Sequence, residues 1–333
     1  MIILTTIKPK KIFVILGITA LFAVMLILMW QIFAPPSTLG LNVAGYEFVF
    51  NEEENSQFVL AELAEEIRWV NFDVPYEALK KAMQLEISAR NDGHENVNWI
   101  EMLSYLACKY WGNWSNYREN DLIALAERLK TGEEMRQISE DMEQFGYFMR
   151  RYGAILSGFL GECEDGEYGL LVYFPIATGY RFSHSDDFGH SRSYGYNRRH
   201  LGHDLMASVG TPVVAIESGI VEVMGWNQYG GWRIGIRSHD GLRYWYYAHL
   251  RKDTPFHTDI AEGESVRAGQ VIGYVGRTGY SRTENVNNIR VPHLHLGLQL
   301  VFDEAEKDGY YQVWIDLYAI TRLLLQNRAA AIN

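Results

Sequence analysis

The sequence contains few cysteines and prolines, no internal repeat and no excess of basic charge. Its 333 residues include two cysteines and eight prolines, with 30 basic against 41 acidic side chains. Two cysteines cannot form a disulfide framework or a four-thiolate metal site. A net charge of −11 argues against a protein whose whole surface follows nucleic-acid phosphates, so we expect no nucleic-acid partner.

Apolar residues, by contrast, are abundant. Hydrophobic residues make up 48% of the chain and aromatic residues 14%, which is enough for sizeable cores and excludes a disordered or fibrous protein. The length is that of about two ordinary domains. A mean hydropathy of −0.15 excludes a protein with many membrane spans but leaves room for a single span.

A long uncharged run lies close to the N-terminus. Residues 12–34 form a run of 23 residues without a charge, enough to cross a hydrocarbon layer of roughly 30 Å as a helix. Lys8, Lys10 and Lys11 precede it, which predicts a cytoplasmic N-terminus and an extracytoplasmic remainder. A cleaved signal peptide is the competing interpretation, but its apolar region would be shorter, about 7–15 residues. We therefore expect a single-pass anchor in the cell membrane.

After this predicted anchor the sequence pattern changes twice. Residues 55–160 show helical periodicity and helix-capping residues, without strand-like alternation. Short β-branched and aromatic runs separated by glycines then predict an antiparallel β domain. We expect an α+β protein with a lysine-rich cytoplasmic start at 1–11, a transmembrane helix at 12–34, a linker at 35–54, a small helical domain at 55–160 and a β-sheet domain at 166–326.

The predicted helical domain leaves two alternatives open. Residues 47–165 hold 24 acidic and 11 basic side chains, so this part carries most of the negative charge. Its surface could bind a basic protein partner or simply remain solvated, which is the more common outcome. Cys108 and Cys163, on the outer side of the membrane in this topology, could form a disulfide or stay free.

Histidines gather in the predicted β domain, where the first motif is His200-x-Gly202-x-Asp204. In an extended segment these three positions share one face, so His200 and Asp204 can converge while Gly202 leaves space between them. Alone, such a pair is more often a surface contact. In the second motif, HLHLGLQL, strand alternation puts His293 and His295 on the face opposite four leucines, which look like core.

A third motif, RYWYYAHL, ends in a histidine. Without a bulge, alternation places His249 on the same face as Arg243, Trp245 and Tyr247. Together the three motifs bring histidines and one aspartate from separate strands. Such a set fits a catalytic zinc site, which takes three nitrogen or oxygen ligands and leaves one position open. Two further imidazoles could then accept and donate protons near neutral pH.

Residues 200–300 resemble the catalytic domain of lysostaphin/LytM-type zinc metallopeptidases, which cleave peptide cross-links of peptidoglycan. The resemblance covers about a third of the chain. It is carried by H-x-x-x-D at 200–204, GTPVVAIESGIVEVMGWNQYGGWRIGIRSHDG at 210–241, YYAHL at 246–250, GESVRAGQVIGYVGRTGYS at 263–281 and HLH at 293–295.

The resemblance implies roles for individual residues. It assigns one Zn²⁺ per chain to His200, Asp204 and His295, and catalysis to His249 and His293. A family tyrosine that stabilises the transition state corresponds to either Tyr194 or Tyr196. We interpret the remaining nearby histidines as structural, and two acidic residues as turn or capping residues: His184, His190, His203, His239, His257, Asp186 and Asp187.

Topology and resemblance together predict a membrane-anchored zinc metalloendopeptidase that hydrolyses peptide cross-links of the cell wall. One alternative is a non-catalytic scaffold that binds the wall or a partner protein. Another is a wall-degrading helical domain in which Glu86 acts as the glutamate acid of lysozyme-like folds. The sequence leaves the cleaved bond open, since both glycine bridges and cross-links with D-amino acids are family substrates.

Overall fold

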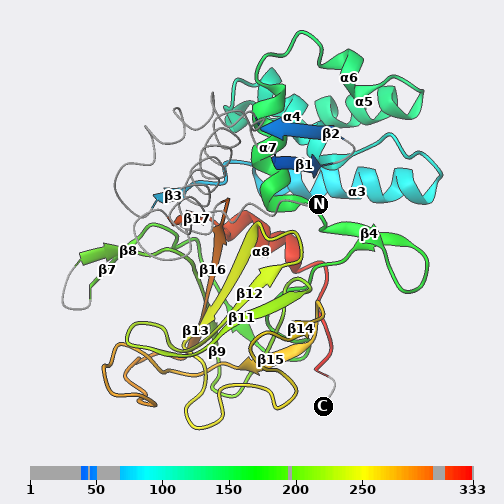
Figure 1. Cartoon of the computed structure of the whole chain (residues 1–333). Coiled ribbons are helices and arrows are strands. Elements are labelled where there is room, and N and C mark those ends of the chain that lie inside the picture. Colours follow the sequence, from blue (N-terminus) through cyan, green and yellow to red (C-terminus); the bar gives the residue numbers. More distant parts are fainter. Residues whose placement is uncertain (1–38, 44–45, 51–67, 194–196, 303–311, 332–333) are drawn as a thin grey trace, which may run out of the picture. The chain divides into compact units, whose positions relative to one another are not determined.

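The computed structural model describes residues 39–43, 46–50, 68–193, 197–302 and 312–331 (Figure 1). The predicted cytoplasmic start and transmembrane helix lie outside these residues, as do Tyr194 and Tyr196. Within the described segments, no helix has the length and apolarity that crossing a membrane requires.

Two short strands come first, in the segment predicted as a linker. β1 (Leu39–Val43) and β2 (Tyr46–Phe50) form a two-stranded sheet. They fall largely in a compact unit separate from the one that holds the rest of the described chain.

A group of helices follows, as the periodicity predicted. Its members are α3 (Tyr76–Asn91), α4 (Trp99–Lys109), the 3₁₀ turn η1 (Trp114–Asn116), α5 (Glu119–Lys130), α6 (Met135–Ile138) and α7 (Phe145–Leu156). The prediction that this segment lacks strands is wrong at Arg68–Val70. β3 (Arg68–Val70) pairs in parallel with β17 (Val313–Ile315), and three residues are too short to show alternation in the sequence.

The C-terminal part is built on a nine-stranded sheet, antiparallel except at β3, which confirms the predicted fold of this region. The strands run in the order β14-β11-β12-β13-β16-β17-β3, most of which can be followed in Figure 1. β9 pairs with the other half of β16, and β6 pairs with β9. Their bounds are β6 (Phe182–Ser183), β9 (His203–Ala207), β11 (Gly219–Asn227), β12 (Gly231–Ser238), β13 (Arg243–Ala248), β14 (Ser265–Val266) and β16 (His293–Leu300).

Three smaller sheets and one helix complete the chain. The pairs are β4 (Leu160–Glu162) with β5 (Tyr168–Leu170), β7 (Ser191–Ser193) with β8 (Asn197–Arg199), and β10 (Pro212–Val214) with β15 (Val271–Tyr274). The helix α8 (Tyr318–Leu324) follows β17.

The two faces of the large sheet have different chemistry. On one face, register pairs join Ile234 to Tyr247 and Tyr247 to Leu296, all fully buried, so this face forms the core as predicted for the leucines. On the other face, Ala248 stands opposite His295 and Tyr246 opposite a glycine. Because opposed residues of paired strands share a face, His295 belongs to this second surface. We call it the groove face.

A buried arginine joins the helices to the sheet. Arg243 on β13 is 2% exposed and forms ion pairs with Glu217 at 2.6 Å and Asp240 at 2.8 Å. Its Nη1 also donates to the carbonyl of Ala154 in α7, at 3.1 Å. The guanidinium is therefore compensated on all sides, as a buried charge requires. Helix α7 is thereby held against the sheet that carries the site.

Candidate metal centre and catalytic histidines

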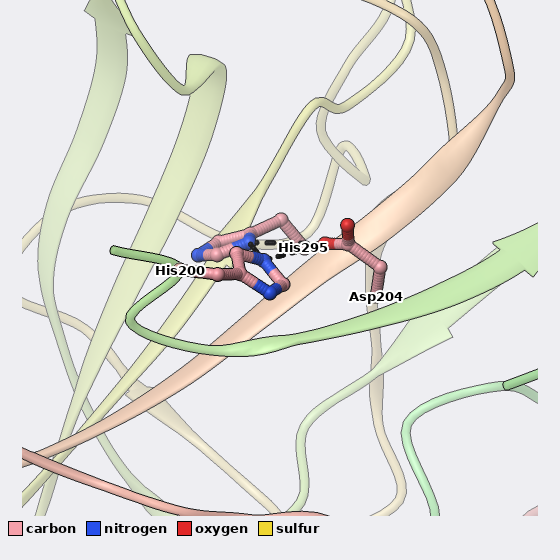
Figure 2. A group of neighbouring side chains, drawn as sticks. All are labelled: His200, Asp204 and His295. Atoms are coloured by element: carbon pink, nitrogen blue, oxygen red, sulfur yellow. Dashed lines mark hydrogen bonds and ion pairs between the residues drawn. The ribbon is translucent and has the colours of Figure 1, made fainter. Parts of the chain in front are cut away.

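The structure brings the three predicted metal ligands together. Asp204 on β9 and His295 on β16 are register partners, and His200 lies just before β9. Figure 2 shows the two imidazoles and the carboxylate directed toward one another. His200 Nε2 lies 2.9 Å from His295 Nδ1 and 3.0 Å from Asp204 Oδ1, and the last two atoms are 3.1 Å apart. The three ligand atoms thus form a nearly equilateral triangle.

This donor set fits a zinc ion. With Zn–N bonds of about 2.0–2.1 Å, a tetrahedral site needs ligand atoms about 3.3 Å apart, so the triangle has to widen by only a few tenths of an ångström. Two imidazole nitrogens and one carboxylate oxygen are ligand types that zinc accepts, and three ligands leave a fourth position open. The ring of His200 has its other nitrogen, Nδ1, 3.0 Å from the carbonyl oxygen of Asp187, which fixes its orientation.

Asp187 is more than the turn or capping residue that the sequence predicted. It is 7% exposed, and its carboxylate oxygens lie 3.2 Å from His200 Nδ1 and 3.1 Å from His203 Nδ1. Arg192 donates to both Asp187 at 2.8 Å and Asp204 at 3.2 Å. Periodicity could not reveal Asp187, because the loop between β6 and β7 brings it to the site.

A buried chain of hydrogen bonds extends from Asp187 away from the ligand triangle. His203 is fully buried, and its Nε2 lies 2.8 Å from Nδ1 of His184. Burial lowers the pKa of His184, with a further contribution from the neighbouring His203. These two histidines therefore act structurally, in agreement with the prediction, by holding Asp187 in place beneath His200.

We expect Asp187→Asn to weaken zinc retention without removing a ligand. An amide cannot offer two acceptor oxygens to His200, His203 and Arg192, and loss of such supporting hydrogen bonds typically lowers metal affinity about 10–100-fold. Chelator competition on the full-length chain measures this. Asp186→Asn is the matched control, because Asp186 is exposed. Equal zinc affinity in the two variants would contradict the role given to Asp187.

His249 reaches the site by a route that strand alternation does not predict. Alternation would place it on the core face with Trp245 and Tyr247, but β13 ends at Ala248 and His249 has φ of +62°. This left-handed conformation is uncommon for a residue other than glycine. Its ring centre lies 4.8 Å from that of His293 and 5.7 Å from that of His295, so the expected shared face is wrong. The backbone turn delivers the ring to the groove face.

His249 and His293 are held in the same way. Nδ1 of His249 lies 2.9 Å from the carbonyl oxygen of Thr278, and Nδ1 of His293 lies 2.8 Å from that of Val291. Because a carbonyl oxygen can only accept, Nδ1 carries the proton in each ring. Nε2 is then the free acceptor, and that of His293 lies 3.7 Å from Asp204 Oδ1. Both rings are thus oriented to exchange protons beside the ligand triangle.

Burial and neighbouring charges set the protonation of the cluster. Burial lowers the pKa of His249 well below its usual value, and the nearby His293 and His295 lower it further. Burial also lowers the pKa of His295 to about 4, although Asp204 opposes the shift. Burial alone would lower the pKa of His200, but hydrogen bonds to Asp187 and Asp204 outweigh it and raise the value to about 9. His249 is therefore neutral at neutral pH.

Glu86 does not support the alternative of a glycan-cleaving helical domain. It is 1% exposed and accepts hydrogen bonds from the backbone N–H of Trp99 and, at 2.6 Å, from the hydroxyl of Tyr168. Burial raises the pKa of this carboxyl group. A side chain enclosed between α3, α4 and β5 cannot reach a polysaccharide, so this alternative is wrong.

The two cysteines, whose pairing the sequence left open, do not form a disulfide in the structure. Cys108 and Cys163 are free thiols.

Comparison with known proteins supports the resemblance. Residues 198–307 match the model of peptidase family M23.

The similar proteins are endopeptidases or peptidases by name. An L-Ala–D-Glu endopeptidase of Bacillus subtilis is 35% identical over 207 residues, 62% of this chain and 57% of the relative. A glycyl-glycine endopeptidase of Staphylococcus capitis is 37% identical over 115 residues, 32% of this chain and 28% of the relative. The solved catalytic domain of lysostaphin from Staphylococcus simulans is 30% identical, with a TM-score of 0.33, and the match covers 42% of this chain and 92% of that one. The chain spans less than two thirds of the length of both curated relatives.

Proposed function

We propose that the chain is a zinc metalloendopeptidase that hydrolyses peptide bonds of cell-wall peptidoglycan. The observation that carries the proposal is the ligand triangle of His200, Asp204 and His295 beside two oriented imidazoles. The M23 match and the endopeptidase relatives support the reaction class. We assign the zinc to these three ligands and the proton transfers to His249 and His293.

The chain's own groups divide the chemistry of hydrolysis between them. Zinc at the triangle would supply Lewis acidity, polarising a peptide carbonyl and lowering the pKa of water to about 7. The free Nε2 of one imidazole can accept a proton from the attacking water, and the other imidazole can return one to the leaving amine. Arg192 and Asp187 hold the side chains of Asp204 and His200 in position for this chemistry.

We also propose that residues 12–34 anchor the enzyme in the cell membrane, with the peptidase on the outer side. The uncharged run and the three preceding lysines support this arrangement. It would place the groove face where peptidoglycan lies. The acidic helical part then stands between the membrane and the peptidase in sequence, where a protein partner could bind it.

Digestion of purified peptidoglycan tests the activity directly. The full-length chain loaded with zinc should produce fragments with new amino and carboxyl termini. Removal of zinc by a chelator should stop their formation. Mass spectrometry of the fragments identifies the cleaved bond. Release of new reducing sugar ends alone, or binding without any cleavage, would contradict the proposal and indicate a glycan-cleaving or scaffold role.

A further inference from the structure

A shallow pocket of ≈ 380 Å³ lies beside the proposed catalytic histidines. Its walls include Arg181, Ser183, Met206, Ser208 and Pro292. Pro292 directly precedes His293 in the chain. The pocket therefore adjoins the proposed catalytic residue on one side.

Strand register places this pocket on the groove face. His293 is the partner of Met206 across β16 and β9, and Met206 is the partner of Ser183 across β9 and β6. His293, Met206 and Ser183 thus form a row across the three strands. This row is two residues along the strands from the Asp204–His295 pair, a distance of about 7 Å at about 3.4 Å per residue. Residues two apart on a strand share a face, so the pocket and the ligand triangle open toward the same side. A peptide extended across the groove can reach both.

Arg181 gives the pocket its charge. Its side chain is exposed, and the described part of the chain offers it no ion pair or hydrogen bond. Other arginines near the site are occupied: Arg192 pairs with Asp187 and Asp204, and Arg198 lies over the ring of Tyr280. None of the described residues that line the pocket is acidic. The guanidinium is thus an uncompensated cation next to the reaction site.

The side chains around Arg181 suit one kind of ligand. A guanidinium binds a carboxylate with two parallel hydrogen bonds, and the hydroxyls of Ser183 and Ser208 can donate to the same oxygens. An uncharged chain such as a glycine bridge offers this cation carbonyl oxygens but no anionic group. We propose that the pocket is a substrate subsite for a peptide carboxylate one or two residues from the cleaved bond.

This inference rests on the proposed peptidase function and narrows its substrate class. A D-glutamate linked through its γ-carboxyl group keeps a free α-carboxylate beside the bond to the preceding L-alanine. Amidation of that group to D-isoglutamine removes the charge and almost nothing else. The pocket therefore favours acidic wall peptides over their amidated counterparts and over glycine bridges.

A pair of matched peptides tests the subsite. The zinc-loaded full-length chain is given L-Ala-γ-D-Glu-L-Lys and L-Ala-γ-D-isoGln-L-Lys peptides, and kcat/KM is measured for each. Because hydrogen bonds to charged groups are roughly twice as strong as neutral ones, we expect about a tenfold preference for the acidic peptide. Arg181→Gln should abolish the preference, and Arg181→Lys should keep part of it, since lysine keeps the charge but not the planar fork.

The matched control removes the same charge elsewhere. Arg136 in α6 is also exposed, and Arg136→Gln should retain the wild-type preference. Equal kcat/KM for the two peptides in the wild-type chain, or a preference that survives Arg181→Gln, overturns the subsite. Cleavage of glycine bridges with no cleavage of either peptide also refutes the subsite but leaves the peptidase in place. Failure to cut any wall peptide refutes the proposed function, and the subsite with it.

Discussion

Replacing His295 by alanine should remove zinc and activity together, whereas replacing His293 should remove activity alone. His295 Nδ1 is one vertex of the ligand triangle, 2.9 Å and 3.1 Å from the other two ligand atoms. His293 stands outside it, with its Nε2 3.7 Å from the shared carboxylate oxygen. We expect His295→Ala to bind no zinc after dialysis, and His293→Ala to keep one ion while kcat falls about 10²–10⁴-fold. Metal analysis and peptidoglycan digestion measure the two quantities.

The control for this pair is a histidine away from the site. Among the charged groups that the structure describes, His257 contacts only the exposed Asp259, at 3.8 Å, so His257→Ala should keep both zinc and activity. Loss of zinc in His293→Ala, or full activity in it, would show that the ligand and catalytic roles are assigned wrongly.

Adding a single methyl group at Gly202 should disable the site although no polar residue is replaced. A Cβ atom there would lie 2.6 Å from Cε1 of His295 and 2.5 Å from the carbonyl oxygen of Leu296. Both distances are shorter than real contacts allow, so the imidazole or β16 must move. Since a misplacement of about 1 Å can cost about 10²-fold in rate, we expect Gly202→Ala to lose most of its zinc and at least that much activity.

Gly146→Ala is the matched control for this substitution. In α7 the added Cβ would meet only a flexible arginine tip at 3.6 Å, so folding, zinc content and activity should remain. Circular dichroism separates local displacement from unfolding in Gly202→Ala. A folded Gly202→Ala protein with full zinc content would contradict the steric account.

Strand alternation predicted the faces of His200, Asp204, His293 and His295 correctly. His293 and His295 project from the face opposite four buried leucines, as a period of two implies, and the structure adds that Asp204 lies across from His295. The absence of a side chain at Gly202 leaves the space that was expected there, and the ring of His295 occupies it. Local periodicity therefore predicted which side chains share a face within each strand, whereas the choice of His200, Asp204 and His295 as the zinc ligands came from the family resemblance and remains a prediction.

Two contributions to the site depend on features that periodicity does not carry. The direction of His249 follows from one left-handed backbone angle after β13, and histidine gives no sign of that conformation in the sequence. Asp187 reaches His200 and His203 through a connection between strands, so its role depends on tertiary structure. The strand β3 was missed for the same reason, since its pairing partner lies near the far end of the chain.

The pairing of β3 with β17 has a consequence for the order of folding. It is the sole parallel ladder of the large sheet, and it joins backbone groups from opposite ends of the compact unit described here. Contacts so distant in sequence form late, because most of the chain must be made and arranged first. The border of the sheet thus stays open during synthesis, with unpaired N–H and C=O groups that can recruit another chain. A nascent or C-terminally shortened protein ending before Val313 should accordingly be the most aggregation-prone form of this molecule.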